Sequence, residues 1–284
     1  MSEAMAYTRD DMDYLKHGSE ALSLRLFRPL GPGPFPLIID LHGGAWTQGD
    51  LSGCQARDEV LAKAGFAAAA LDFRHAGDGY PASLLDINYA IRWLKSRADE
   101  FSIDPGRVAL TGQSSGGHLA MLAAMRPDDE RYTSIALASD TTADMTADVR
   151  CVAMTWPVIN PLSRYRHALR LRQGDGAPAW TGNIPERHDL YWKDETNMAE
   201  GNPLLALERG EGVERPPALW IQGQPDQIHD YRDPESALAL NEPERFAARY
   251  REAGGEIDVV YVDQADRDQA SYAPLVDFFQ KHLG

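Results

Sequence analysis

Cysteine is nearly absent from this sequence, with only Cys54 and Cys151 in 284 residues. Two thiols cannot build a disulfide framework, so we expect both to be structural and the fold to rest on a hydrophobic core. Basic residues are scarce as well, since 28 Lys and Arg stand against 43 Asp and Glu and leave a net charge of −15. A surface of that sign repels a phosphate backbone, which argues against nucleic acid as a partner.

Long apolar runs are also missing. No stretch approaches the roughly 18 apolar residues that a membrane-spanning helix needs, and the N-terminal residues MSEAMAYTRDDMD contain acids but no apolar core of a signal peptide. The sequence has neither an internal repeat nor a low-complexity tract. Hydrophobic residues make up 43% of the chain, enough for a sizeable core. We therefore expect a globular, cytoplasmic protein with no membrane partner.

Strand and helix patterns alternate along the chain after an opening hairpin. The predicted strands are 12–17, 20–27, 35–41, 66–73, 107–111, 149–156, 218–222 and 257–262. The predicted helices are 53–64, one opened by Pro81, 115–124, 243–253 and 273–282, with a turn at 104–106. This alternation predicts a single α/β domain, residues 1–284, whose mostly parallel central sheet has helices on both faces. Ligands of such sheets bind beyond the carboxyl ends of the strands.

The segment 157–213 follows no simple period and is rich in aromatic residues, arginine and proline. We expect it to form a cap insertion over the edge of the sheet. Five of its basic residues cluster within nine positions: Arg164, Arg166, His167, Arg170 and Arg172. They either attract an anionic substrate or pair with surface carboxylates. Its aromatic residues either line a pocket or anchor the cap to the core: Tyr165, Trp180, Tyr191 and Trp192.

The segment Gly112-Gln113-Ser114-Ser115-Gly116 fits the pattern Gly-x-Ser-x-Gly between a predicted strand and a predicted helix. A sharp strand-to-helix turn of this kind holds the serine backbone in strain and exposes its hydroxyl as a nucleophile. The helix N-terminus also favours negative charge beside Ser114. The alternative is a serine that merely caps a helix between two glycines. The strand–helix context favours the nucleophile.

The segment His42-Gly43-Gly44-Ala45-Trp46 follows another predicted strand. Two glycines let the backbone present N–H groups to a ligand, as acyl transfer requires where the carbonyl oxygen becomes negative. We expect donors from Gly43 and Gly44, and a third from the N–H of Ser115. The alternative is a glycine loop that only leads into a helix. His42 is expected to brace this loop rather than to shuttle protons.

These two motifs, together with Leu71-Asp72-Phe73-Arg74 and Tyr80-Pro81-Ala82, resemble the α/β-hydrolase superfamily. The resemblance is to the hormone-sensitive-lipase-like and acetyl-esterase or feruloyl-esterase-like branch, which is similar to the kynurenine formamidases. It is strongest over residues 36–125. It implies an α/β-hydrolase fold that hydrolyses carboxylic esters or formamides of small-molecule substrates without cofactor or metal. It also implies a serine, an acid and a histidine in that order, with Ser114 first and Asp226 second.

The histidine of that order is not where the resemblance places it, a few residues past the last strand. By spacing, Asp266 occupies its position, and no histidine lies between His229 and His282. A serine needs a base to act near neutral pH, and a carboxylate is a weak one unless burial or a neighbouring carboxylate raises its pKa. His229, three residues after Asp226, is the other candidate. The sequence leaves both open.

We therefore expect a serine hydrolase of small or aromatic carboxylic esters that forms an acyl-enzyme. Ser114 attacks, the donors of Gly43, Gly44 and Ser115 hold the oxyanion, and Asp226 orients or tunes an atypical or relocated base. One alternative is a lyase-type enzyme that uses the oxyanion hole without an acyl-enzyme. The other is a catalytically dead ligand-binding protein, because the plant gibberellin receptors resemble this branch and have lost the histidine. Substrate identity and a homodimer stay open.

Overall fold

The structure of the chain, a computed structural model, describes residues 4–137, 145–174 and 176–284. The first three residues of the acidic N-terminal stretch and residue 175 of the predicted cap insertion lie outside this part. None of the helices in the described ranges is long and apolar enough to cross a bilayer.

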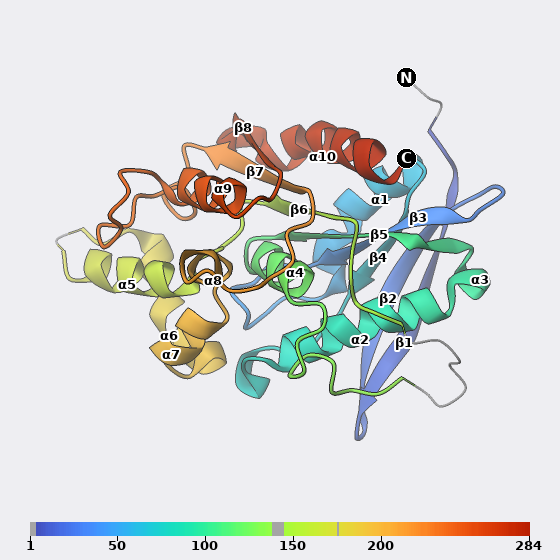
Figure 1. Cartoon of the computed structure of the whole chain (residues 1–284), viewed down its shortest axis with the longest axis horizontal. Helices are drawn as coiled ribbons and strands as arrows, with labels where there is room; N and C mark the ends of the chain where they lie inside the picture. The colour runs from blue at the N-terminus through green and yellow to red at the C-terminus, as the bar shows by residue number, and fades with distance from the viewer. Residues whose placement is uncertain (1–3, 138–144, 175) are drawn as a thin grey trace.

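Eight strands form one sheet in the order β1-β2-β4-β3-β5-β6-β7-β8 (Figure 1). The strands are β1 (Tyr7–His17), β2 (Glu20–Pro29), β3 (Phe35–Leu41), β4 (Ala67–Leu71), β5 (Ile103–Gln113), β6 (Cys151–Thr155), β7 (Ala218–Gln224) and β8 (Ile257–Asp263). β3 to β8 pair in parallel, whereas the β1–β2 hairpin joins β4 in antiparallel fashion. Each predicted strand overlaps an observed one. The predicted fold class, a mostly parallel α/β-hydrolase sheet, is confirmed.

Helices cover both faces of the sheet. They are α1 (Gln55–Lys63), α2 (Ala82–Ser96), α3 (Ala98–Phe101), α4 (Ser115–Met125), α5 (Pro161–Arg172), α6 (Ile184–Trp192), α7 (Glu195–Glu200), α8 (Pro203–Glu208), α9 (Glu242–Glu252) and α10 (Arg267–Leu283). Alternate residues of β3 face opposite layers, because side chains of a strand point to opposite faces in turn. Leu37 and Ile39 pack in the core that includes α2 and α4, while Ile38 packs with α1 and α10 (Figure 1).

The last helix and the turn at 104–106 differ from the sequence prediction. The last helix begins at Arg267 instead of residue 273 and continues through Pro274. Its first turn lacks the apolar spacing on which the prediction depended. The turn predicted at 104–106 lies inside β5, where the N–H of Gly106 donates to Asp104 Oδ1 at 2.9 Å. The pairing of β5 with β3 shifts register at this place. The turn is therefore an irregularity within a longer strand.

The strand order creates a switch point between β3 and β5. From β3 the chain passes to β4 on one side, and it later returns through α2 to β5 on the other side. Leu41 pairs with Gly112 at the carboxyl ends of these strands. Because connections diverge in opposite directions there, a crevice opens between the two following loops. Those loops are the two glycine motifs of the sequence.

The segment predicted as a cap contains α5, α6, α7 and α8 between β6 and β7. The first three helices contact one another and lie together at the end of the molecule away from the β1–β2 hairpin (Figure 1). The fourth, α8, packs instead against α4 and α9. The described part of this insertion therefore has three clustered helices and one that returns to the helical layer of the sheet.

Candidate active site

Ser114 stands between the last residue of β5 and the first of α4 with φ +53° and ψ −116°. This left-handed backbone is strained for a residue with a side chain. Three hydrogen bonds hold it: its N–H donates to Thr155 O at 3.0 Å, and its carbonyl accepts from the N–H groups of Val158 at 3.1 Å and His118 at 3.2 Å. Its side chain makes no capping hydrogen bond to the helix. The hydroxyl is therefore free to meet another partner.

The glycines of this turn are required by close backbone contacts. A Cβ on Gly112 would lie 2.4 Å from the carbonyl carbon of Gly116. A Cβ on Gly116 would lie 2.1 Å from Leu41 O. Neither position tolerates a side chain, because real Cβ atoms do not approach backbone so closely. The two glycines let α4 begin directly against β3 and β5.

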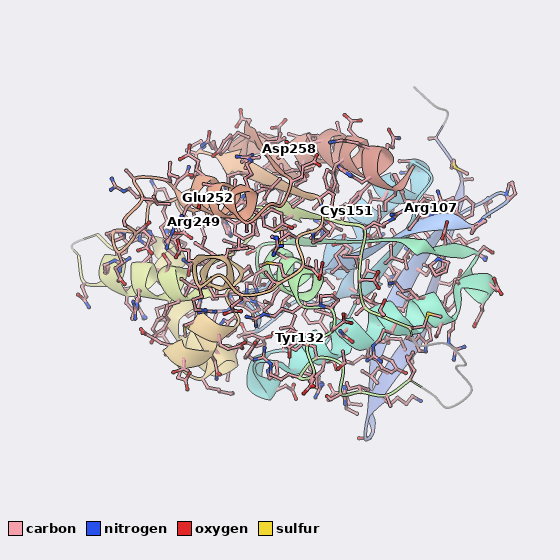
Figure 2. All side chains as sticks on the ribbon, viewed as in Figure 1. Arg107, Tyr132, Cys151, Arg249, Glu252 and Asp258 are labelled. Atoms are coloured by element: carbon pink, nitrogen blue, oxygen red, sulfur yellow. The ribbon has the colours of Figure 1, made fainter. Side chains whose placement is uncertain are left out.

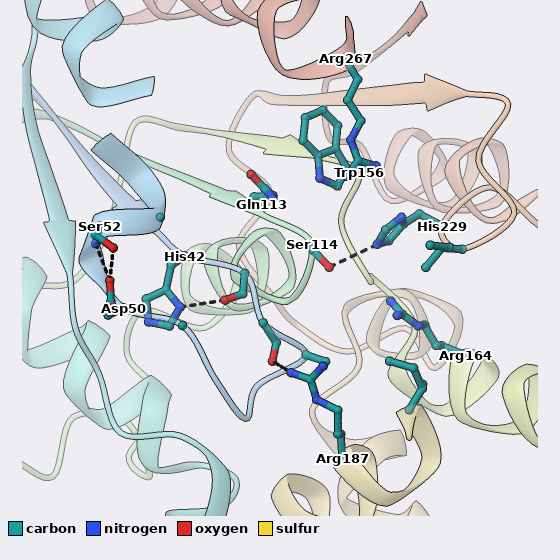
Figure 3. A pocket seen from close by; sticks show the side chains of 17 residues that line it. His42, Asp50, Ser52, Gln113, Ser114, Trp156, Arg164, Arg187, His229 and Arg267 are labelled. Carbon is teal, nitrogen blue, oxygen red and sulfur yellow. Dashed lines mark hydrogen bonds between the residues drawn. The ribbon is translucent and has the colours of Figure 1, made fainter. Parts of the chain in front are cut away.

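The hydroxyl of Ser114 meets the imidazole of His229. Ser114 Oγ lies 3.2 Å from Nε2 of the ring (Figure 3). Nδ1 of the same ring donates to Asp226 Oδ2 at 2.8 Å. His229 and Asp226 lie in the loop that follows β7, and both are buried. Because Nδ1 carries the proton in the bond to the carboxylate, Nε2 of a neutral ring presents its lone pair to the hydroxyl. A serine, a histidine and an acid thus form one hydrogen-bonded chain.

Asp226 organises the loop that carries the histidine. Its Oδ1 accepts from the N–H groups of Ile228 at 2.8 Å and His229 at 3.2 Å, and its Oδ2 also accepts from Gln222 Nε2 at 3.2 Å. Burial alone would raise the pKa of Asp226, but the hydrogen bonds from His229 and from the backbone hold it at about 2. The carboxylate is therefore ionised at neutral pH and fixes the ring orientation.

His229 is poised as a neutral base. Burial lowers its pKa to about 4, against the opposing effect of the Asp226 hydrogen bond, and the charges of Arg164 and Arg267 lower it further. At neutral pH the ring is therefore uncharged and able to accept a proton. A proton that it accepts would be stabilised mainly by Asp226.

Asp266 lies apart from this chain. It is exposed in the turn Gln264–Asp266 that follows β8. Within the described residues its carboxylate has no hydrogen bond to Ser114 or His229. The next residue, Arg267, lines the cavity instead. The structure thus brings together Ser114, His229 and Asp226 and leaves Asp266 at the surface, so the site has a histidine although the position after β8 does not supply it.

The loop after β3 presents unused N–H groups beside Ser114. Across the described ranges, the N–H groups of Gly43, Gly44 and Ser115 have no acceptor. The ring of His42 stacks on Phe73, and its Nδ1 donates to Gly43 O at 2.8 Å. Because C=O and N–H of a trans peptide point in opposite directions, this bond leaves the N–H of Gly44 on the other edge. His42 braces the loop, as the sequence predicts.

Arg187 of α6 ties the insertion to the same loop. Its Nε donates to Thr47 Oγ1 at 2.7 Å, and its Nη2 donates to the carbonyl of Gly44 (Figure 3). No sequence pattern predicts this contact, because Arg187 lies outside the arginine-rich stretch and belongs to no motif. The insertion thus helps to fix the peptide next to the candidate oxyanion donors.

The motifs enclose an open cavity of about 440 Å³. Its walls are the Gly43–Gly44 loop, the Ser114 turn, His229, Ile184 and Ile228, with three arginines and one aromatic ring: Arg164, Arg187, Arg267 and Trp156. No sequence motif identifies Trp156 and Arg267 as residues of this cavity. Tyr191 and Trp192 are fully buried against Trp46 and so anchor the insertion instead of lining the cavity.

The arginine-rich stretch of α5 divides into two groups. Three of its guanidinium groups form ion pairs with carboxylates, as the surface alternative predicts. These pairs are Arg166 with Glu195 and Glu235, Arg170 with Glu235 and Asp233, and Arg172 with Glu186 (side chains are drawn in Figure 2). Arg164 alone turns from α5 into the cavity.

Comparisons with known proteins identify relatives of this chain and of its fold. A family model described as BD-FAE matches residues 26–236. The probable carboxylic ester hydrolase LipM of Mycobacterium tuberculosis is 38% identical over 103 residues, 35% of this chain and 24% of LipM. An arylesterase of Saccharolobus solfataricus is 25% identical over 216 residues, 74% of this chain and 63% of that protein. The matched stretches thus span less than two thirds of these relatives.

Solved structures share the fold across the whole chain. A Pyrobaculum calidifontis esterase superposes with a TM-score of 0.73 at 18% identity, over 98% of this chain and 86% of the other. The esterase Est2 of Thermogutta terrifontis gives 0.69 at 22% identity, over 97% and 92%. At such identities the likeness concerns the fold alone.

Proposed function

The chain belongs to the BD-FAE family, and from this membership and the geometry of the site we propose that it is a carboxylic ester hydrolase acting through an acyl-enzyme on Ser114. The observation that carries the proposal is the hydrogen-bonded chain from Ser114 through His229 to Asp226, beside three unused N–H donors. The relatives named as carboxylic ester hydrolase and arylesterase support small or aromatic esters as substrates.

In the proposed mechanism, His229 Nε2 takes the proton of Ser114 as Oγ attacks the ester carbonyl. The N–H groups of Gly43, Gly44 and Ser115 hold the negative oxygen of the tetrahedral intermediate. His229 then gives its proton to the departing alcohol, and the C–O bond breaks to leave the acyl-enzyme. A water molecule attacks the acyl group, His229 takes its proton, and the proton returns to Ser114 Oγ as the acid leaves.

The base in this proposal is relocated. In the family resemblance the histidine follows the last strand, whereas here His229 follows β7 and lies three residues after the acid. The bonds from Ile228 and His229 to Asp226 support this assignment, because they bring the ring within reach of Ser114. The helices α5 to α7 would act as a cap that narrows access to the cavity.

The test of this function is labelling by a fluorophosphonate probe, which reacts with activated serines. We expect the probe to modify Ser114 and the modified peptide to be found by mass spectrometry. A ligand-binding protein or a lyase would retain the pocket without an activated nucleophile, and its Ser114 would stay unlabelled. The short contact between Ser114 and His229 favours the hydrolase over both alternatives.

Gly44→Ala is expected to lower kcat by at least about a hundredfold, the usual effect of losing one oxyanion donor. Gly44 has φ +131°, and a Cβ there would lie 1.8 Å from Gln48 O, so the backbone must move and displace its N–H. The matched control is Gly53→Ala, in the same cavity wall, where a Cβ meets only His42 Cβ at 3.7 Å. Steady-state kinetics with 4-nitrophenyl acetate measure kcat for both variants and for the wild type. Equal kcat in both variants would make the loop structural only.

A further inference from the structure

Arg164 is a buried cation in the wall of the cavity that has no ion pair among the described residues and faces only the ring of Trp180, at 5.8 Å. Its side chain points from α5 toward Ser114 and His229 (Figure 3), and only 4% of the residue is exposed. Nε and Nη1 are both buried, and within the described part of the chain neither has a hydrogen-bond acceptor. An unpaired buried charge is costly to a fold, so such a group usually serves a ligand or a partner.

Neighbouring groups do not satisfy this charge. Asp226, the carboxylate whose charge acts on Arg164, already accepts from His229, Gln222 and the backbone. Burial lowers the pKa of Arg164 to about 10, so the guanidinium remains charged at neutral pH. The other arginines of the cavity have polar partners: Arg187 donates to the Gly44 loop, and Arg267 lies 3.7 Å from Asp226 Oδ2 and stacks on Trp156 at 4.3 Å.

The cavity contrasts with the rest of the molecule. The chain has a net charge of −15, yet three guanidinium groups and one carboxylate, Asp50, line the space in front of Ser114. The side chain of Asp50 is held by the hydroxyl and N–H of Ser52. A local positive field inside an acidic protein selects anions that enter the cavity.

On the basis of the proposed esterase function, we propose that Arg164 binds a carboxylate of the substrate, so that the preferred esters carry a second, ionised carboxyl group. A guanidinium donates charge-assisted N–H···O bonds to a carboxylate, which fix its orientation as well as its charge. Of the three arginines that line the cavity, Arg164 is the one with neither a hydrogen bond nor an ion pair among the described residues, so it is the one left to receive a carboxylate. The cavity of about 440 Å³ suits a small molecule of this kind.

Two pairs of esters test this selectivity and locate the carboxylate. In the first pair the charge is on the acyl part: 4-nitrophenyl hydrogen glutarate against its methyl ester. In the second pair it is on the alcohol part: 3-acetoxybenzoate against methyl 3-acetoxybenzoate. We expect kcat/KM to favour the anion by about tenfold or more in at least one pair, as for a charged hydrogen bond in a buried site. Equal values in both pairs, in an active enzyme, would overturn the proposal and leave the Ser114 chemistry standing.

The matched variants are Arg164→Met and Arg166→Met. Both remove one positive charge from α5, but Arg166 points outward to Glu195 and Glu235. We expect Arg164→Met to abolish the preference within a pair, Arg164→Lys to keep part of it, and Arg166→Met to keep all of it. An unchanged preference in Arg164→Met together with a lower melting temperature would make Arg164 structural and overturn the proposal.

Binding to Ser114→Ala protein tests the inference without catalysis. Isothermal titration calorimetry with monomethyl glutarate and 3-hydroxybenzoate should detect binding that is weakened about tenfold or more by Arg164→Met, given the usual worth of a charge-assisted bond. This measurement remains valid even if no ester is hydrolysed, so it separates failure of the inference from failure of the proposed function. Equal affinity with and without Arg164 for both anions would contradict the inference.

Discussion

Replacement of Ser114 by alanine is expected to lower kcat for 4-nitrophenyl acetate by roughly 10⁴- to 10⁶-fold, the range for loss of a catalytic nucleophile. The variant retains the oxyanion donors and the base but has no oxygen to form the acyl-enzyme. Its stability should stay close to that of the wild type, because the hydroxyl makes no capping bond to α4. Initial rates, with thermal melting to check the fold, measure both effects.

The control for Ser114→Ala is Ser52→Ala. Ser52 lines the same cavity, but its hydroxyl is bonded to Asp50 and meets no histidine. We expect its kcat to stay within about threefold of the wild type, because substitution of an exposed residue away from the reacting atoms disturbs the protein little. Activity of Ser114→Ala within tenfold of the wild type would show that Ser114 is not the nucleophile.

The sequence predicts well the features that depend on local pattern, and poorly those that depend on contacts between distant segments. β3 was predicted at its observed bounds, since its apolar run ends at a proline-rich loop on one side and at His42 on the other. The two glycine motifs were also placed correctly relative to strands, because chain order alone puts the ends of β3 and β5 at one edge. These features depend on local pattern and on a general rule for parallel sheets.

The histidine that contacts Ser114 lies in a loop, and no hydrophobic periodicity predicts the course of that loop. His229 reaches Ser114 only because Asp226 accepts the N–H groups of its own turn and so folds the loop back toward β5. Spacing from the last strand indicates Asp266 instead, and a count of residues cannot tell an exposed turn from a buried one. The structure separates the two candidates by burial and by distance.

The arginines of α5 show the same limit. Arg164 and Arg166 are two residues apart, which on a helix places them about 200° apart around the axis. One therefore faces the cavity and the other faces Glu195 and Glu235. The sequence shows the cluster, but which face is buried is decided by how α5 packs on its neighbours.

His229→Ala is expected to lower kcat/KM by about a thousandfold or more, in the range found for loss of a general base.

In the wild type the ring must be neutral to act, and its pKa is lowered to about 4 by burial and by the charges of Arg164 and Arg267. Activity should therefore rise with pH through about 4 and be nearly constant from pH 5.5 to 8. An ordinary histidine, with a pKa of about 6.5, would still be mostly protonated at pH 5.5.

The pH profile of kcat/KM for a neutral ester also tests the cause of the low pKa. Because the charge of Arg164 opposes protonation of His229, Arg164→Met should move the acidic limb to higher pH. Arg166→Met, which removes a charge from the outer face of the same helix, should leave it in place. A wild-type limb between pH 6 and 7 would contradict the assignment of a buried, unprotonated ring as the base.

Asp266 supplies the opposing experiment. It is exposed, and His229 already meets Ser114, so Asp266→Ala and Asp266→His should both retain wild-type kcat/KM. Loss of activity in Asp266→Ala, or a large gain in Asp266→His while His229→Ala is silent, would place the functional base after β8. If His229→Ala alone is inactive, the proton moves between Ser114 and the loop after β7, because no carboxylate at the surface can replace a neutral ring held 3.2 Å from the hydroxyl.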